Sequence, residues 1–453
     1  MSTTLPNGGF RTVSKKETRR ATTIAFFAWT IAVYDFILFG TLLPRIEESF
    51  EWEPSFALLV STLVSIGTFV VVMLFGPVVD RLGRRKGMVI SVGGTALSSA
   101  ATAATTGAAS LIGVRSISGM GLAEQSVNAT YLNELYALTE DTKIKRNQGF
   151  VYSMVQTGWP LGALLAAGFV GIVTSVFGPD SWRLAFLLAT IPAIAVAIIC
   201  LALKESPQFL AQKALRRLRK EGNEEQAQEL SRTLGLAETK GSSLSRIFQG
   251  TQRRNTIVLA LAWIFNWFGI QTFSVLGTTV LESGKGIDAG GALVLVVLSN
   301  LVGALGYLTH GWLGDRLGRR NVIVGGWILA GVFFAAMLLG PSDQIYVLVT
   351  YMLGLFFLLG PYAAILFFQA ECYSTDCRAT GGTFVAAMSQ PGAIIGGLLL
   401  TWMVAQQMPF STAALLVGAI GTSVSGLIML GAKSIAPTFS RKDATPVESE
   451  AVQ

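Results

Sequence analysis

The sequence predicts an all-α membrane protein with twelve transmembrane helices in two pseudo-symmetric bundles of six. Long apolar blocks recur along the whole chain, and one loop motif appears twice, about half a chain apart. A third observation, the distribution of the basic residues, gives the helices a direction across the membrane.

The apolar blocks are too long and too sparsely charged for a soluble protein. Of 453 residues, 51% are hydrophobic and 13% are charged, whereas soluble domains carry about 25% charged residues. A block of about 20 apolar residues spans the hydrocarbon core as one helix, because a helix satisfies its own backbone groups in lipid. The expected spans are 22–43, 56–79, 86–107, 109–132, 148–175, 182–203, 255–280, 288–312, 321–340, 344–370, 378–403 and 410–432.

The chain therefore divides into five parts. We expect a tail over 1–21, a six-helix bundle over 22–203, a linker over 204–254, a second bundle over 255–432 and a tail over 433–453. The first block is too long for the apolar region of a signal peptide, so it is predicted to be a retained helix.

The linker and the tails are polar. Residues 211–236 are predicted to form one or two amphipathic surface helices, with too few large apolar residues for a separate domain. Residues 1–20 and 437–453 have the composition of disordered chain.

The net charge of +7 orients the protein and does not indicate nucleic-acid binding. Thirty of the 34 Lys and Arg fall in the tails or in the loops after even-numbered spans; the exceptions are Arg45, Arg115, Arg183 and Lys285. This asymmetry places both termini in the cytoplasm. We expect a multi-pass protein of the plasma membrane, from its pattern the cytoplasmic membrane of a bacterium, and a monomer.

The sequence contains no motif for binding a cofactor or for catalysis. Cys200, Cys372 and Cys377 have neither a zinc spacing nor a disulfide pattern, and no nucleotide loop or catalytic string appears. We expect no metal, no cofactor and no enzyme activity, with a small molecule, protons and the lipid bilayer as partners.

An internal repeat relates the two halves. Asp-Arg-Leu-Gly-Arg-Arg occurs at 80–85 after the second span and at 315–320 after the eighth. A weaker echo follows the fourth and tenth spans, where Glu134 precedes Arg146-Asn147-Gln148-Gly149 and Glu371 precedes Arg378-Ala379-Thr380-Gly381. Such repeats are typical of transporters whose halves rock about a central site.

These motifs resemble the signature of the major facilitator superfamily, over essentially the whole chain. Tyr34-Asp35-Phe36-Ile37-Leu38-Phe39-Gly40 and Gln156-Thr157-Gly158-Trp159-Pro160-Leu161-Gly162 are similar to strings of its metabolite:proton symporters, and Glu205-Ser206-Pro207-Gln208-Phe209 also matches sugar porters. One departure is Gly121-Leu122-Ala123-Glu124-Gln125, where the metabolite branch tends to have Gly-Gly-Glu-Trp.

Two charges inside spans are the main candidates for proton coupling. Asp35 lies roughly 20 Å from the cytoplasmic end of span one, and Arg115 roughly 9 Å below the outer end of span four, so both sit at one level. An ionisable group in a span is expensive unless paired or hydrated. We expect Asp35 to carry the proton and Arg115 to tune it or to grip a substrate carboxylate; the alternative is a structural salt bridge. The resemblance supports coupling, because Arg115–Gly121 looks like the proton-linked motif of span four.

Glu124 and His310 are further ionisable candidates. Glu124 is nine residues beyond Arg115, out of phase with it, and is expected either in the proton path or substrate site or in a polar contact between helices. His310 immediately precedes the second repeat, and we expect it to be a plain residue of the membrane interface.

The repeated loops predict a charge network that closes the cytoplasmic side. Aspartates and glycines recur with the arginines, which positive-inside charge alone does not explain. We assign to this gate Asp80, Arg81, Gly83, Arg84, Arg85, Glu134, Arg146, Asp315, Arg316, Gly318, Arg319, Arg320, Glu371 and Arg378.

A substrate pocket is expected from the polar and aromatic residues inside spans. The candidates are Tyr34, Tyr152, Gln156, Trp159, Asn266, Trp267, Gln271, Asn300, Tyr362 and Gln390. We expect proton-coupled uptake of a small organic acid. Sugar or polyol symport and drug antiport are the alternatives; the Gly158–Gly162 string fits the symporter form better than the exporter form. A non-transporting sensor is a fourth class, which usually adds a large soluble region.

Overall fold

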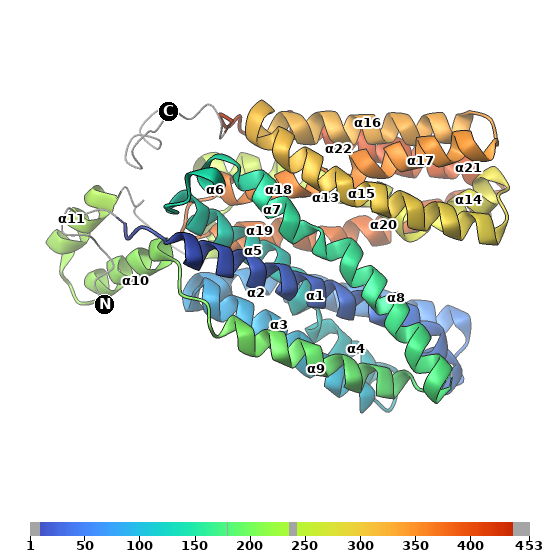
Figure 1. Cartoon of the computed structure of the whole chain (residues 1–453), viewed down its shortest axis with the longest axis horizontal. Helices are drawn as coiled ribbons and strands as arrows, with labels where there is room; N and C mark the ends of the chain where they lie inside the picture. Colours follow the sequence, from blue (N-terminus) through green and yellow to red (C-terminus); the bar gives the residue numbers. More distant parts are fainter. Residues whose placement is uncertain (1–9, 179, 235–241, 438–453) are drawn as a thin grey trace.

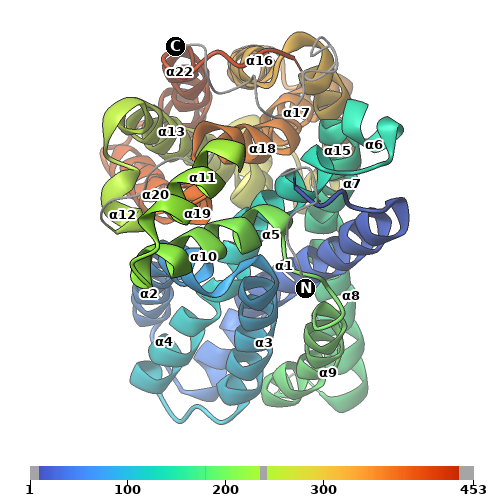
Figure 2. The ribbon, with the colours of Figure 1, turned by 90° about the vertical axis from the view of Figure 1, so that its left-hand side faces the viewer.

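Two bundles of long helices lie side by side in the computed structural model, which describes residues 10–178, 180–234 and 242–437 (Figure 1). The N-terminal half and the C-terminal half each run the length of the molecule, and the polar linker covers one end. Both described chain ends lie at that end, which we call the linker end (Figures 1 and 2). The predicted class, an all-α membrane fold in two halves, is confirmed.

The N-terminal half contains nine helices, several of which continue one another. They are α1 (Lys15–Ser49), α2 (Pro54–Leu82), α3 (Arg84–Ala103), α4 (Ala108–Ile117), α5 (Gly119–Ala137), α6 (Thr142–Arg146), α7 (Gln148–Gln156), α8 (Gly158–Phe177) and α9 (Trp182–Cys200). The chain turns between α3 and α4, at the boundary of the predicted third and fourth spans.

The C-terminal half repeats this pattern. It contains α13 (Gly250–Gly269), the π-helical η1 (Ile270–Val275), α14 (Gly277–Lys285), α15 (Ala289–Leu317), α16 (Arg319–Leu339), α17 (Gln344–Leu359), α18 (Tyr362–Cys372), α19 (Arg378–Ala387), α20 (Ser389–Ala405), α21 (Phe410–Ala414), the π-helical η2 (Leu415–Ala419) and α22 (Ile420–Met429).

Breaks recur at equivalent places in the two halves. The fourth and fifth predicted spans are interrupted at Ser118 and Thr157, the tenth at Gly360 and Pro361, and the eleventh at Met388. Ser118 and Thr157 keep helical dihedral angles, and their hydroxyls donate to carbonyls three residues earlier, so the rods bend without turning back.

Each of the twelve predicted spans coincides with a helix or a run of helices. In the described part of the chain, nine segments are long and apolar enough to cross a membrane. The other three rods are α3, the charge-bearing α4–α5 pair and α15, so twelve spans remain a prediction. Large apolar side chains such as Leu164, Ile172 and Ile191 are about two-thirds exposed on the outer surface, as expected for contact with lipid.

The linker forms α10 (Pro207–Lys220), α11 (Glu224–Leu234) and α12 (Ser243–Arg246), which cross the linker end (Figure 2). Helices α10 and α11 lie where the surface helices were predicted, up to Leu234; residues 235 and 236 lie outside the described part. Ala211 and Leu215 of α10 pack on Ala227 and Leu234 of α11, together with Phe10.

The prediction of a disordered tail over 1–20 is wrong for residues 10–20. Helix α1 begins at Lys15, and Val13 forms a β-bridge with Thr139 in the loop after α5. Backbone bonds from Val13 N to the Leu138 carbonyl and from Glu140 N to the Val13 carbonyl hold this contact. Composition missed it because the partners are far apart in sequence. Residues 1–9 and 438–453 lie outside the described part.

The halves meet along two equivalent seams, α2 against α19 and α7 against α15. Glycines permit this approach. A Cβ on Gly149 would lie 2.7 Å from the Gly311 carbonyl oxygen, and one on Gly76 would lie 2.6 Å from Thr380 Cα. A larger residue would therefore separate the halves near the linker end.

Candidate functional site

A cavity lies between the halves. Helices from both halves supply its walls. The N-terminal half contributes Trp29, Val72, Leu122, Gln125 and Trp159; the C-terminal half contributes Trp263, Trp267, Ile270, Ser274, Tyr307, Leu359, Tyr362, Ala386 and Ser389.

Aromatic rings dominate this central cavity. Trp29 and Trp159 pack with ring centroids 6.0 Å apart, and Trp263 and Tyr362 with centroids 5.2 Å apart in an edge-to-face arrangement. None of the described residues that line the cavity carries a charge. A flat apolar ring is therefore a better fit to these walls than a highly hydroxylated molecule.

Two residues of the cavity wall also carry unpaired hydrogen-bond donors. The indole N–H groups of Trp29 and Trp263 are buried and have no acceptor in the structure. They come from opposite halves, on α1 and α13. Because a buried donor without a partner is costly, these two groups are suited to an acceptor brought by a ligand.

The structure brings only some of the predicted pocket residues to the cavity. Trp159, Trp267 and Tyr362 line it. Asn266 lies behind the wall and accepts a hydrogen bond from the Tyr362 hydroxyl at 2.6 Å. Tyr152 and Gln156 connect to the wall through Gln125, whose Nε2 donates to Gln156 Oε1 at 3.0 Å.

Four predicted pocket residues do not line the cavity. Among the described side chains, the lining does not include Tyr34, Gln271, Asn300 or Gln390. Tyr34 lies on another face of α1 and packs edge-to-face on Phe169 of α8, within the N-terminal half. The sequence missed Trp29, Trp263, Tyr307 and Gln125, because polarity within a span does not show which face of the helix meets the other half.

Asp35 and Arg115 form a buried ion pair. Arg115 Nη2 lies 3.1 Å from Asp35 Oδ2, Arg115 Nη1 lies 3.3 Å from Asp35 Oδ1, and the Ser99 hydroxyl donates to Asp35. The guanidinium also lies over the rings of Phe39 and Phe186, 4.9 and 5.4 Å from their centroids. Arg115 is 1% exposed and is not part of the cavity lining, so in this conformation it does not grip a substrate there.

Glu124 lies elsewhere and has a different environment. It is completely buried on α5, and Asn128 Nδ2 donates to its Oε2 at 2.9 Å. Its Oε1 has no hydrogen-bond partner. Glu124 and Arg115 have different neighbours, as their spacing of nine residues predicted.

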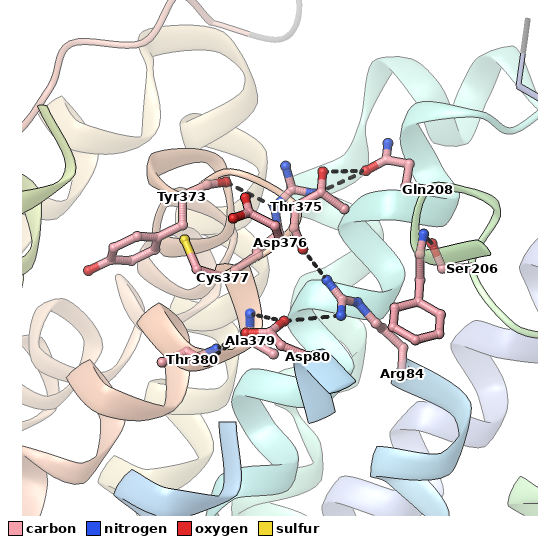
Figure 3. A network of polar contacts seen from close by, with 12 residues as sticks. Asp80, Arg84, Ser206, Gln208, Tyr373, Thr375, Asp376, Cys377, Ala379 and Thr380 are labelled. Carbon is pink, nitrogen blue, oxygen red and sulfur yellow. Dashed lines mark hydrogen bonds and ion pairs between the residues drawn. The ribbon is translucent and has the colours of Figure 1, made fainter. Parts of the chain in front are cut away.

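At the linker end, Asp80 of the first repeat caps the helix that begins the eleventh rod (Figure 3). Asp80 Oδ2 accepts from the backbone N–H and hydroxyl of Thr380 at 2.8 and 2.7 Å, and Oδ1 accepts from Ala379 N at 3.3 Å. A carboxylate at the start of α19 is stabilised by the free N–H groups and the helix dipole. The cap joins the two halves, since Asp80 belongs to α2.

The second repeat makes the equivalent cap. Asp315 accepts from the backbone N–H groups of Gly149 and Phe150, each at 3.0 Å, at the start of α7. Each aspartate therefore binds the first turn of a helix in the opposite half. Gly83 and Gly318 follow with φ of 111° and 88°, a left-handed region that favours glycine, and let α3 and α16 start immediately.

Arginines connect the same two aspartates with Glu134 and Glu371, the glutamates that follow the fourth and tenth spans. Arg84 contacts Asp80 at 3.1 Å and Glu134 at 3.0 Å, and its Nη2 donates to the Thr375 carbonyl across the seam at 2.6 Å. Arg378 of the other half lies 3.4 Å from Glu134.

In the second copy, Arg319 contacts Asp315 at 3.3 Å and Glu371 at 2.5 Å. Together these seven residues form what we call the linker-end gate: Asp80, Arg84, Glu134, Asp315, Arg319, Glu371 and Arg378.

The remaining gate candidates lie around this core. Arg85 donates to the Leu201 carbonyl, Arg320 donates to the Ala432 carbonyl, and Arg316 lies over the Trp312 ring. Arg81 is exposed, and Arg146 is the last residue of α6.

The linker adds contacts that the sequence did not assign. Glu205 Oε1 accepts from the backbone N–H groups of Arg84 and Arg85, which begin α3. Burial raises the pKa of Glu205, although these N–H groups act in the opposite direction. Gln208 accepts from Arg378 Nη1 at 3.0 Å, so the linker binds both halves (Figure 3). The Glu205–Phe209 string was the available signal.

His310 is not an interfacial residue. It is 2% exposed, its Nδ1 is 2.8 Å from the Gly306 carbonyl, and its ring packs on Phe356 and Phe357 inside the C-terminal half. Gly326 and Gly360 make room for this ring. The space beside these two glycines accommodates the ring inside the bundle. The position of His310 next to the repeat in the sequence did not indicate this burial.

The sequence matches a family of known proteins over most of its length. The family described as sugar (and other) transporter matches residues 21–433. Similar proteins include the niacin transporter NiaP of Acinetobacter baylyi, 24% identical over 89% of this chain and 91% of its own length. The 4-hydroxybenzoate transporter PcaK of Pseudomonas aeruginosa is 29% identical over 71% of each chain.

Among solved structures, the proton:xylose symporter XylE of the major facilitator superfamily has the same fold. It superposes with a TM-score of 0.70 at 16% identity, over 92% of this chain and 95% of that chain.

The two caps predict a crossed pattern of hydrogen exchange. Asp80→Asn removes the charge and one acceptor at α19, so the amides of Ala379 and Thr380 should exchange about ten- to a hundredfold faster, as expected for losing 1.5–3 kcal/mol, about the contribution of a charged hydrogen bond. Asp315→Asn should instead accelerate Gly149 and Phe150. Hydrogen–deuterium exchange with mass spectrometry measures both, and each variant is the control for the other. Equal protection in wild type and variants would contradict the caps.

Proposed function

Since the chain belongs to the sugar (and other) transporter family, we propose that it takes up a small aromatic carboxylic acid together with protons by alternating access. The observation that carries this proposal is the uncharged aromatic cavity between the halves, with unpaired indole N–H groups from each half. The family supplies the transport activity, and the cavity supplies the class of substrate.

The walls favour an aromatic acid for two reasons. Stacked and edge-to-face contacts with tryptophan and tyrosine bind a planar ring. The N–H groups of Trp29 and Trp263 can donate to carboxylate oxygens, which are strong acceptors. A sugar would need many more polar partners than Gln125, Ser274, Ser389 and the two tyrosine hydroxyls provide.

The similar proteins support the same class. Niacin and 4-hydroxybenzoate, which name two of them, each carry a carboxyl group on a six-membered aromatic ring. The similarity is 24–29% identity, so it supports the class of substrate and leaves the individual acid to experiment.

Alternating access is supported by the symmetric seams and the linker-end gate. The excess of basic residues at the linker end supports a cytoplasmic location for that end and for both termini, and we propose that the membrane is the plasma membrane of a bacterium. On that orientation the structure is closed toward the cytoplasm. Rocking of the halves, over 22–203 and 255–432, would break both aspartate caps together and open a path to the cavity. We propose that one chain is the transporting unit.

Proton coupling is proposed at the Asp35–Arg115 pair. The pair stabilises the ionised carboxylate in this conformation, since two guanidinium N–H groups and the Ser99 hydroxyl donate to Asp35. Separation of α1 from α3 and α4 would remove these donors, so we propose that Asp35 exchanges the coupled proton as the pair forms and breaks during the transport cycle.

Uptake into proteoliposomes tests the substrate class. With an inward proton gradient, radiolabelled aromatic acids should accumulate above equilibrium, and aliphatic acids and sugars should not. A protonophore should abolish the accumulation without abolishing exchange. Accumulation of sugars with none of any acid would make this proposal wrong.

The indole donors predict a loss of affinity. Trp263→Phe keeps an aromatic ring and removes the N–H, so the apparent affinity for a transported aromatic acid should fall about ten- to a hundredfold, as for a lost bond to a charged group. Trp312→Phe is the matched control, because Trp312 is exposed on α15 and lies against Arg316. Equal affinities for both variants, measured by competition of uptake, would contradict the role of the donor.

Asp35→Asn tests the coupling pair. This variant cannot release a proton, so uphill uptake should be lost while counterflow exchange of labelled for unlabelled acid continues. Gradient-driven accumulation at the wild-type level would exclude Asp35 as a carrier of the coupled proton.

A further inference from the structure

Glu124 is a buried carboxyl group without a cation. It is 0% exposed, it accepts one hydrogen bond from Asn128, and within the described ranges no ion pair includes it. An ionised carboxylate in such a place is strongly destabilised, and removal of the charge by protonation is the usual outcome. Glu124 therefore holds a proton in this conformation.

The contrast with Asp35 is in the partners and not in the burial. Both acids are buried in the N-terminal half, yet only Asp35 has an arginine within 3.1 Å. The titratable groups that face Glu124 from other helices are Tyr152 on α7 and Cys200 on α9, and neither is a cation. Asp35 therefore has the arginine and the hydroxyl donor that an ionised carboxylate needs, and Glu124 has no cation beside it.

A chain of hydrogen bonds connects Glu124 with the cavity wall. Tyr152 donates its hydroxyl hydrogen to Asn128 Oδ1 at 2.9 Å, Gln156 Nε2 donates to the Tyr152 oxygen at 2.7 Å, and Gln125 Nε2 donates to Gln156 Oε1 at 3.0 Å. Every group donates in the direction of Glu124. Gln125 lines the cavity, so a change in the protonation of Glu124 can alter, through these hydrogen bonds, the side chain that meets a bound molecule.

We propose that Glu124 is a proton-binding site that makes the central cavity receptive to an organic anion only while the proton is bound. The inference rests on the proposed function, because it takes a carboxylate as the substrate. The cavity lining has donors but no positive charge, so an ionised Glu124 would add a second negative charge that nothing in the lining compensates. By linkage, binding of the anion strengthens binding of the proton to the same degree.

The other half of the protein controls the exit of the proton. Phe367 of α18 packs on Tyr152, with ring centroids 4.3 Å apart, and the Arg319 guanidinium lies 5.1 Å from the Phe367 centroid. Arg319 is part of the linker-end gate. When the halves separate at that end, Phe367 leaves Tyr152 and water reaches the chain. The proton, taken from water on the outer side, then passes to water on the cytoplasmic side.

The pH dependence of binding tests this site in the full reconstituted chain. With 4-hydroxybenzoate as the probe, wild-type affinity should rise about tenfold for each unit of falling pH where Glu124 titrates, as one linked proton requires. Glu124→Gln, a neutral mimic, should bind with the tight affinity at every pH, keep counterflow and lose uphill accumulation. Glu48→Gln removes an exposed carboxylate that pairs with Arg45 in the same half, and it should keep the wild-type pH dependence of binding. Unchanged pH dependence or uphill accumulation in Glu124→Gln overturns the proposal.

Infrared difference spectroscopy without substrate separates this site from the proposed function. The carbonyl band of a protonated carboxyl group should titrate in wild type and in Asp35→Asn and should be missing from Glu124→Gln. Absence of that difference overturns the proton site whatever the substrate is. If the band titrates but wild type binds no acid at any pH, the proposed function fails and the link between proton and anion fails with it. If a variant does not fold, the pH dependence of wild-type binding still tests the proposal, because its absence overturns the link between proton and anion.

Discussion

Two carboxylates hold the halves of this protein together at one end. Asp80 and Asp315 each accept hydrogen bonds from the first turn of a helix in the opposite half, and each is also bound by an arginine of its own half. A carboxylate at a buried helix N-terminus contributes up to about 2 kcal/mol. The close approach of Gly149 and Gly311 depends on this contact, and so do the closed linker end and the contact of Phe367 with Tyr152.

The buried charges elsewhere follow one rule, that a charge inside the bundle has a partner or is neutralised. Arg84, Arg319 and Arg115 each face at least one carboxylate. Glu124 has no cation as a partner among the described residues. We propose that a proton is held there, and it lies in the half that also contains the Asp35–Arg115 pair. The two halves are thus symmetric in their gate and asymmetric in their ionisable interior.

A neutral cavity changes how coupling can work. In the proposed function the walls would bind a ring through aromatic contact and a carboxylate through indole donors, but they would not compensate the charge of an anion. Compensation would then depend on ionisable groups outside the cavity, which can respond to the opening and closing of the halves. The proposed sites for substrate and proton are spatially separate and are connected by Gln125, Gln156, Tyr152 and Asn128.

The sequence by itself determined the all-α class, the two halves and the repeated loops, and it predicted the direction in the membrane. These follow from local composition and from identity between distant segments, which need no knowledge of packing. It also placed Asp35 and Arg115 at one level, because helical rise converts residue number into depth. Only the tertiary structure decided which face of each helix meets the other half. It moved Tyr34 into the N-terminal bundle, brought Trp29 and Trp263 to the cavity, put Asp80 on α19 and buried Glu124 without a cation. In lipid both faces of a helix are apolar, so no amphipathic period distinguishes the face that packs on protein from the face that contacts lipid.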